Sequence, residues 1–488
     1  MRLNYLANAV GLTLMYIGLV ILSPICVALF YNETNAIIPF LTAAIISGSI
    51  GFSLRKFVPK ASTLENLNDI KKSEALFIVA SVWIVFGLVA SIPYLFFGLN
   101  PLNAIFEAVS GITTTGATIL THFDYPHAFF FWRSLTQWLG GLGIIVLFIA
   151  VLPQFAVAGR QMFFAEAPGP TEDKFTPRIR NTASALWKIY LGFTILETAF
   201  LIWAGMPVFD AVCNSFSTVS AGGFSPHSES IIGYGSDKIT WIVLIFMFIA
   251  GVSFNLQYKV FATKNPFILF ENEEFRAYFG MVLLMSGLIA LSLFFHNGFD
   301  QIKNIMHSLF QVISITTSSG FASVDFEKWN YTSKLLLFLV MFMGACASSA
   351  GGGIKMARWL VVFKSMKSEI LKILHPNAVV NIKIDNKTVP AETARQIVVF
   401  VFFYFLIFGI TAMLMSIIEQ NSAIGLTGAI SSLGNIGPGV ATATGPLGNY
   451  DHLHFLSKII YIFNMLVGRL ELIPFLVMFS RDFWTLKD

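Results

Sequence analysis

Long apolar runs follow one another along the whole chain, separated by short polar linkers. A helix of about 20 apolar residues is needed to cross the hydrocarbon core of a bilayer. Runs of that length lie near residues 6–30, 36–53, 76–97, 129–152, 185–205, 239–261, 277–296, 334–366, 396–417 and 455–480. The pattern therefore predicts an all-α membrane protein with about ten transmembrane helices.

The linkers between these runs differ in charge. Lysine and arginine gather in every second linker, beginning after the second run, whereas segments 98–128 and 206–237 contain neither residue. Membrane proteins keep an excess of lysine and arginine on the cytoplasmic side. The charges thus predict a multi-pass protein with both termini in the cytoplasm, and we expect its membrane to be the bacterial inner (plasma) membrane.

Composition narrows the class of protein. Of the 488 residues, 56% are hydrophobic and 12% are charged, and the charged share is about half that of a typical soluble chain. This excludes a disordered chain, a secreted disulfide scaffold and an ordinary cytosolic enzyme. The cytoplasmic linkers account for the net charge of +4, so we expect membrane lipid, and no nucleic acid, around the chain. Cys26, Cys213 and Cys346 lie far apart, and we expect them to be buried as small apolar residues.

Four segments on the predicted outside resemble one another. Each follows a half-length apolar stretch, and in each a serine lies six residues before a glycine. They read EAVSGITTTGAT (107–118), NSFSTVSAGGFS (214–225), FQVISITTSSGFAS (310–323) and AISSLGNIGPGVA (429–441). The repeat predicts a unit of helix, half-helix, glycine strand and helix that occurs four times around one pseudo-fourfold axis.

This repeat divides the chain into five parts. The first holds two additional N-terminal helices and a cytoplasmic linker, and the others are pore units 1 to 4, of which the third has a broken second helix. Their predicted ranges are 1–70, 71–160, 161–265, 266–385 and 386–488.

The chemistry of the repeat suits a dehydrated cation. Potassium that enters a membrane must exchange its water shell for oxygens at fixed positions, and backbone carbonyls from four segments can supply them. Glycine permits the backbone angles that aim carbonyls at one axis, and the C-terminus of a half-helix carries a partial negative charge. The alternative is a set of outside loops in which Gly, Ser and Thr only form turns. The candidate K⁺ ligands are Thr114, Thr115, Gly116, Ala221, Gly222, Gly223, Ser318, Ser319, Gly320, Asn435, Ile436 and Gly437.

The motifs TTTGAT, SAGGFS, TTSSGFAS and NIGPG resemble the four filter motifs of the Trk/Ktr/HKT superfamily of potassium transporters. The two extra N-terminal helices and the length resemble its TrkH/TrkG branch rather than the shorter KtrB branch. In that superfamily a serine in place of the first filter glycine is associated with sodium transport, so Gly116 implies selectivity for potassium. The fourth repeat departs most, with Gly434 and Asn435 where the others carry hydroxyl or small residues.

The eighth apolar run is interrupted. The sequence MFMGACASSAGGGIKMARW places three glycines in the middle of a helix, and each costs about 1 kcal/mol relative to alanine. It lacks the GK[ST] of a phosphate loop. Close helix packing through small residues is one interpretation, and a flexible constriction below the filter is the other. The resemblance implies a gating loop here, made of Ser348, Ser349, Ala350, Gly351, Gly352, Gly353 and Lys355.

Arg469 lies near the centre of the last apolar run. A charge there costs at least about 2.5–3.5 kcal/mol on insertion scales, so its side chain should face the protein interior or water. It could act as an electrostatic barrier in a cation pathway, or pair structurally with Glu471 or Glu197. The resemblance implies an arginine that is directed into the pore.

Three functions compete. The first is a potassium uptake protein with a carbonyl filter and a gate in the middle of the membrane. The second is a secondary transporter of a small organic solute, although that class usually has two inverted repeats. The third is a membrane-embedded enzyme, for which the sequence offers no HExxH, GxSxG or nucleotide loop. The resemblance further implies K⁺ as the transported ion, no organic cofactor, a membrane homodimer and a cytosolic nucleotide-binding ring of the TrkA type.

Overall fold

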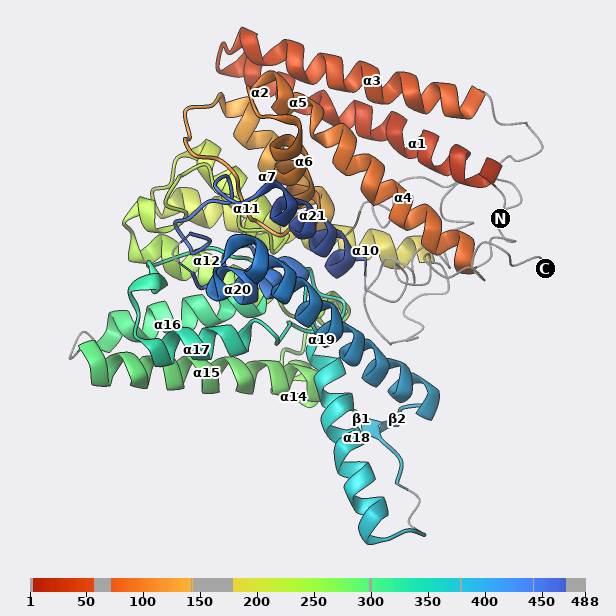
Figure 1. The fold of residues 1–488 in the computed structure, drawn as a ribbon, viewed down its shortest axis with the longest axis vertical. Coiled ribbons are helices and arrows are strands. Elements are labelled where there is room, and N and C mark those ends of the chain that lie inside the picture. Colours follow the sequence, from red (N-terminus) through yellow and green to blue (C-terminus); the bar gives the residue numbers. More distant parts are fainter. Residues whose placement is uncertain are drawn as a thin grey trace.

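The computed structural model describes residues 3–56, 72–141, 143, 179–297, 301–377, 380–441 and 443–470. Within these residues the protein is built from helices and one short antiparallel hairpin, β1 (Lys383–Ile384) with β2 (Lys387–Thr388). Figure 1 shows the helices packed side by side, with the lower part of one helix, α18 (Met356–Leu374), extending away from the others.

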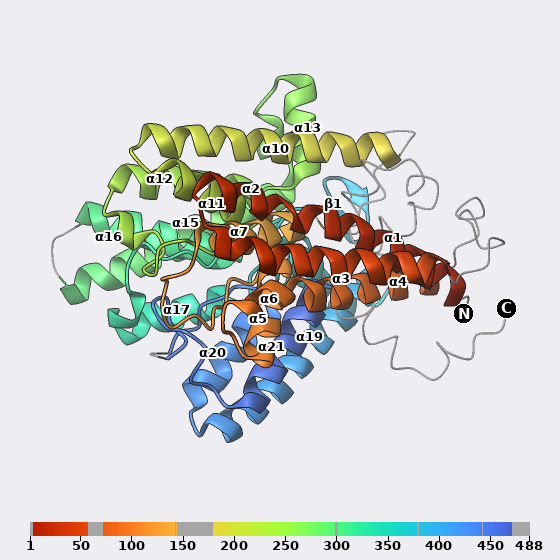
Figure 2. The ribbon, with the colours of Figure 1, turned by 90° about the horizontal axis from the view of Figure 1, so that it is seen from above.

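The N-terminal helices form a hairpin that lies along one edge of the molecule in Figure 1 and faces the viewer in Figure 2. It consists of α1 (Leu3–Ile21), α2 (Ser23–Phe30) and α3 (Ile37–Lys56), with a 3₁₀ turn at Thr34–Ala36. Glycines bring α1 and α3 close together, because a Cβ on Gly11 or Gly51 would collide with the carbonyl of the other. The hydroxyl of Ser47 then donates a hydrogen bond across the pair to the carbonyl of Leu14, at 2.7 Å.

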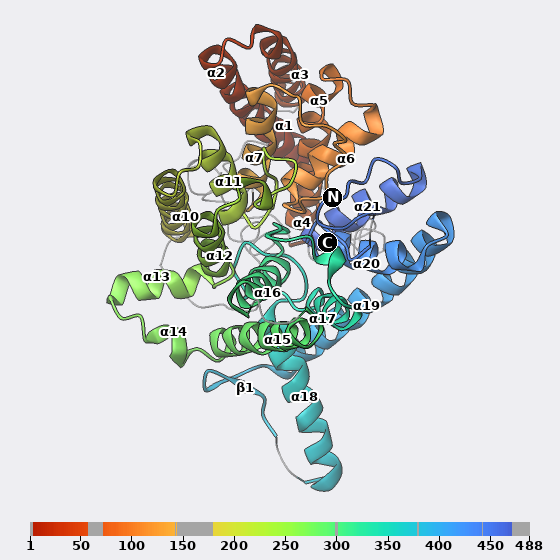
Figure 3. The same ribbon diagram turned by 90° about the vertical axis from the view of Figure 1, so that its left-hand side faces the viewer.

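The rest of the chain repeats one arrangement, a long helix followed by a short helix that ends in a non-helical segment. The first two such parts contain α4 (Lys72–Ala90), α5 (Ile92–Phe96), α6 (Pro101–Ile112), α7 (His127–Gly141), α10 (Ile179–Trp203), α11 (Val208–Val219), α12 (Asp237–Ala250), α13 (Phe254–Thr263) and α14 (Ile268–Glu271). The last two contain α15 (Glu273–Asn297), α16 (Gln301–Thr316), α17 (Tyr331–Val340), α18, α19 (Ala391–Glu419), α20 (Ser422–Leu433) and α21 (Phe455–Arg469), with 3₁₀ turns at Ile232–Tyr234 and Phe326–Lys328. In Figure 3 the short helices α6, α11, α16 and α20 surround a common centre.

Among the described residues, six helices are long and apolar enough to cross a membrane. They are Ala7–Phe30, Thr34–Lys56, Phe77–Phe96, Ser184–Trp203, Glu273–His296 and Ala391–Glu419. The fourth and tenth predicted spans run into residues outside the described part, and the eighth is divided between α17 and α18. A helical multi-pass architecture is therefore present, whereas the number of ten stays a prediction.

The sixth predicted span, 239–261, is not one straight helix. The axes of α12 and α13 differ by 96° across a short break. The backbone groups freed at the bend find partners in the segment before α18: the N–H of Cys346 donates to the carbonyl of Gly251, and the N–H of Phe254 to that of Ser348, both at 3.0 Å. Irregular backbone at membrane depth needs such partners. The sequence around the bend does not predict them, because the partners lie far along the chain.

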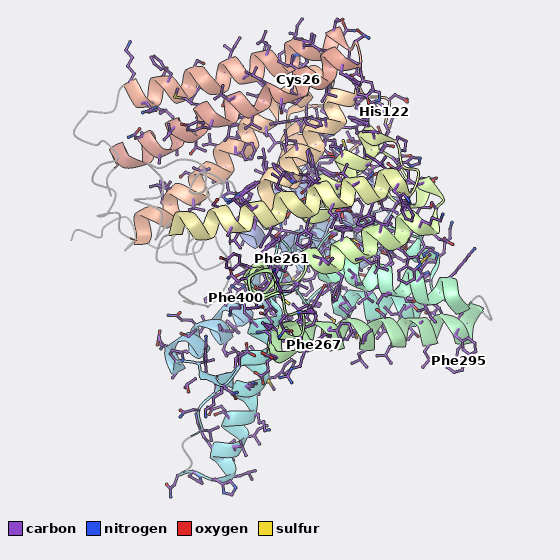
Figure 4. All side chains as sticks on the ribbon, turned by 180° about the vertical axis from the view of Figure 1, so that it is seen from behind. Cys26, His122, Phe261, Phe267, Phe295 and Phe400 are labelled. Atoms are coloured by element: carbon purple, nitrogen blue, oxygen red, sulfur yellow. The ribbon has the colours of Figure 1, made fainter. Side chains whose placement is uncertain are left out.

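Large apolar side chains cover the periphery, as expected of a surface that faces lipid. Figure 4 shows Phe261, Phe267 and Phe295 on outer turns and helix ends, and 73% of Phe267 and 77% of Phe295 are exposed. Cys213 and Cys346 are buried as expected, but Cys26 on α2 (labelled in Figure 4) is exposed. The expectation of burial was wrong for Cys26 because a lipid-facing position is as apolar as a buried one.

Candidate ion pathway

The short helices α6, α11, α16 and α20 end in the same way. At each C-terminus one backbone N–H bonds back three residues and the next bonds back five, as in a Schellman motif. The second of these bonds measures 2.8–2.9 Å and always ends on the carbonyl of the repeated serine, Ser110, Ser217, Ser314 or Ser431. One shared turn thus carries the chain from each helix into the segment that follows.

The turn residue has a left-handed backbone in all four cases, although it is never glycine. Its φ is 54° at Thr114, 59° at Ala221, 57° at Ser318 and 53° at Asn435. Few non-glycine residues adopt a positive φ, and such backbone persists where the surrounding structure enforces it. Fourfold recurrence indicates that the fold imposes this conformation.

The glycine two residues further on also has a positive φ, of 79° at Gly116, 81° at Gly223, 71° at Gly320 and 99° at Gly437. We call the segments 113–117, 220–224, 317–321 and 434–438 the glycine loops. A Cβ on each glycine would overlap a carbonyl oxygen of the next loop in sequence, and one on Gly437 would overlap that of Thr115 in the first. The contacts close on themselves, so the four loops form a ring in chain order, which requires glycine for both conformation and space.

The ring is rich in oxygen atoms. The hydroxyls of Thr113 and Thr115 lie 2.8 Å apart, and those of Thr317 and Ser319 lie 2.9 Å apart. Gly116, Gly223 and Gly320 are partly exposed between buried neighbours. In the described part of the chain, no hydrogen-bond donor contacts the carbonyl oxygens of these three glycines. Such oxygens are suitable ligands for a cation.

Two polar side chains on α7 support the second glycine loop and the segment directly after the first. Arg133 forms a buried ion pair with Glu107, with Nε to Oε1 at 2.7 Å, and Glu107 accepts the N–H of Ile119 at 3.0 Å. Gln137 donates to the carbonyl of Gly222 at 2.7 Å and accepts the N–H of Phe224 at 3.0 Å. The sequence pattern did not predict this support, although Arg133 is a charged residue in a predicted span.

The segment between α17 and α18, which we call the 341–355 loop, is not helical and lies directly against two glycine loops. The N–H of Gly352 donates to the hydroxyl of Ser318 at 2.6 Å. A Cβ on Gly351 or Gly352 would collide with the carbonyls of Thr317 and Gly434, respectively. The predicted interruption of the eighth span is therefore present, and its small residues pack against loops rather than against a helix.

Two charged side chains hold the 341–355 loop, Lys355 from within the loop and Glu274 from α15. Lys355 is 4% exposed, and its Nζ donates to the carbonyls of Gly351 at 2.6 Å and Ser349 at 3.3 Å. Glu274 accepts the backbone N–H groups of Ala347 at 2.5 Å and Ala357 at 3.0 Å. A basic and an acidic side chain thus satisfy some of the backbone groups that have no helical partner in this segment.

Arg469, the last residue of α21, joins this loop to α7. Its guanidinium donates to the carbonyls of Ala350 at 2.9 Å and Gly141 at 2.8 Å, and also to that of Gly140. Glu197 is not its partner, since both carboxylate oxygens of Glu197 lack a hydrogen bond among the described residues. Glu471, the other candidate partner, lies outside the described residues.

Acidic residues lie in the segments that follow the third and fourth glycine loops. Burial is the main reason that the pKa of Glu327 lies above its ordinary value; Lys334 opposes this effect and Asp325 adds to it. Asp451 instead takes part in a network with Asn103 and the buried Lys458.

A family model described as TrkH, a cation transport protein, matches residues 41–485 of the chain. The chain belongs to this family. It is 35% identical to the Trk system potassium uptake protein TrkH of Salmonella typhimurium over 99% of its length and 100% of the relative's. It is 32% identical to the TrkG protein of Escherichia coli, with 97% of each chain covered.

A solved structure agrees with this assignment. The potassium transporter TrkH of Vibrio parahaemolyticus superposes with a TM-score of 0.87 at 31% identity, over 99% of this chain and 100% of the other. The family assigned from the filter motifs is therefore confirmed. The family consists of transport proteins, which excludes the membrane-embedded enzyme, and these relatives give no support to a transporter of organic solutes.

Proposed function

We propose that this protein takes up potassium by conducting K⁺ through the ring of glycine loops. The observation that carries the proposal is the closed contact order of the four loops, in which each glycine faces a carbonyl of the next. Such a ring offers a dehydrated cation several oxygens at fixed positions. The relatives named as potassium uptake proteins identify the ion, and the presence of Gly116 favours K⁺ over Na⁺.

We further propose that the twelve candidate ligands form this filter and that Ser348–Gly353 with Lys355 form a gate below it. The contact between Gly352 and Ser318 supports the gate, because movement of the loop would disturb the filter directly. Arg469 would act as a barrier, since it places a positive charge between the gate and α7. A cation in the pathway would then pass the filter, the gate segment and this charge.

The architecture and surroundings of the pore belong to the same proposal. The chain would consist of the five predicted parts, with four pore units around the ring, in a bacterial inner membrane with both termini cytoplasmic. It would form a homodimer that binds a cytosolic nucleotide-binding ring of the TrkA type. The basic residues between 354 and 395 offer a surface for that ring, and α18 extends this surface away from the other helices (Figure 1).

The deciding experiment is ion flux through purified protein in lipid vesicles, with opposed K⁺ and Na⁺ gradients and with pH varied. We expect K⁺ flux that exceeds Na⁺ flux, and rescue of growth at low potassium in a host deficient in uptake. Flux of an organic solute without K⁺ flux would contradict the proposal. A dependence of K⁺ flux on the proton or sodium gradient would distinguish coupled from passive transport.

A further inference from the structure

The glycine of the fourth loop differs from the other three at its carbonyl oxygen. The carbonyl of Gly437 accepts hydrogen bonds from the hydroxyls of Tyr450 at 2.5 Å and Ser431 at 2.7 Å. Gly437 is also buried, whereas Gly116, Gly223 and Gly320 are partly exposed. Hydrogen bonding and burial therefore single out the same loop.

A carbonyl oxygen has two lone pairs, and both are engaged at Gly437. A cation could use this oxygen only if one of the two hydrogen bonds were given up. The third loop contrasts with this arrangement, because the equivalent serine, Ser314, donates to the carbonyl of Phe321, one residue beyond the glycine, at 2.7 Å. The carbonyl of Gly320 is thereby left without a donor among the described residues.

Tyr450 is held firmly in place. Its backbone N–H donates to the carbonyl of Thr118 at 2.9 Å, which ties it to the first repeat. Its ring lies 4.9 Å from the ring of Tyr461 and 5.7 Å from that of Phe106, measured between centroids. The next residue, Asp451, accepts a hydrogen bond from Asn103 at 2.6 Å. The hydroxyl is thus presented to Gly437 by a rigid support between the first and fourth repeats.

We propose that Tyr450 is a positioning residue that keeps the Gly437 carbonyl engaged with the protein, so that the ring binds a cation at this level through three glycine carbonyls instead of four. This inference rests on the proposed function of the ring as a K⁺ filter. Fewer ligands bind the ion less tightly, and conduction requires a site that the ion can leave. Tyr450 would therefore set the affinity for K⁺ rather than form part of the binding site.

The test compares Tyr450→Phe with Tyr461→Phe in purified, reconstituted protein, with initial K⁺ influx measured against K⁺ concentration. Tyr461 is a matched control, since it is buried beside Tyr450 and its hydroxyl has no hydrogen bond among the described residues. Loss of one hydrogen bond to Gly437 should lower the KM for K⁺ by roughly 2- to 10-fold, together with the maximal rate. Ser431→Ala should act in the same direction, and the double variant should exceed either single variant.

The outcomes separate this inference from the proposed function. If the wild-type protein carries K⁺ but Tyr450→Phe and Tyr461→Phe have the same KM, the inference about Tyr450 is overturned and the proposed function is not. A higher KM in Tyr450→Phe, together with a loss of selectivity for K⁺ over Na⁺, would also overturn the inference. It would show that the Tyr450 hydroxyl only supports the structure of the loop. Wild-type protein that carries no K⁺ would overturn both. If Tyr450→Phe does not fold, as judged by thermal unfolding, the KM of Ser431→Ala decides.

Discussion

Arg133 brings a positive charge into the mostly apolar helix α7, and its ion pair with Glu107 holds the segment directly after the first glycine loop, where Glu107 accepts the N–H of Ile119. Its partner Glu107 is fully buried, and Arg133 is 2% exposed. The arginine also lies over the ring of Phe224, 3.9 Å from the centroid, in the second loop. Burying both charges is costly, and removing only one leaves the other without compensation. The pair should therefore act as a unit.

We predict that Arg133→Met destabilises the folded protein by about 3–5 kcal/mol. The physical reason is the uncompensated carboxylate of Glu107, which then faces an apolar surrounding. The double variant Glu107→Gln with Arg133→Met should recover much of this loss. Thermal unfolding in detergent measures the effect, and additive losses in the double variant would show that the two side chains do not act together.

Gly116 has a left-handed backbone and is also a candidate K⁺ ligand in the first glycine loop. We predict that Gly116→Ser relaxes the selectivity for K⁺ over Na⁺, because a Cβ there would push against the Gly222 carbonyl and widen the ring. Gly409→Ser is the control, since a Cβ at Gly409 meets nothing within 4 Å. Reversal potentials or competing fluxes in vesicles provide the measurement, and equal selectivity of the two variants would contradict the assignment of the first loop.

At the scale of elements, the sequence predicted the short helices, the glycine loops and the interruption of the eighth span, because apolar length and clustered glycines are local signals. It missed the bend between α12 and α13, since the partners that make the bend possible lie about 95 residues away around Cys346 and Ser348. It also missed Gln137, whose role depends on the approach of Phe224 from another repeat. Contacts between repeats cannot be recovered from local patterns.

The 341–355 loop yields the prediction at this scale. Deleting residues 349–352 should raise K⁺ flux, because the deletion removes the segment that packs against Thr317 and Gly434. Flux per folded protein in vesicles is the measurement. Loss of folded protein without a gain in flux would favour the interpretation that these small residues serve packing alone.

Arg469→Ala tests the contact between the 341–355 loop and the end of α7. Its guanidinium bonds to Ala350 and to the end of α7, so its loss should free the loop and remove the positive charge. We expect higher conductance with normal insertion into the membrane. Arg469→Lys, which keeps the charge but not the forked geometry, separates these two effects, and wild-type conductance in both variants would leave Arg469 a structural residue.

At the scale of the whole molecule, the fold and the charge pattern make a joint prediction about orientation. Tyr331 begins α17 and is 90% exposed, whereas Ile373 lies near the end of α18 and is 79% exposed. The excess of lysine and arginine between 354 and 395 predicts that Ile373 lies in the cytoplasm and therefore that Tyr331 lies outside. Single cysteines at these positions, with the three native cysteines replaced, should react with a membrane-impermeant thiol reagent from opposite sides. Tyr331→Cys should label in intact cells and Ile373→Cys only in inverted vesicles, and labelling of both from one side would refute the proposed topology.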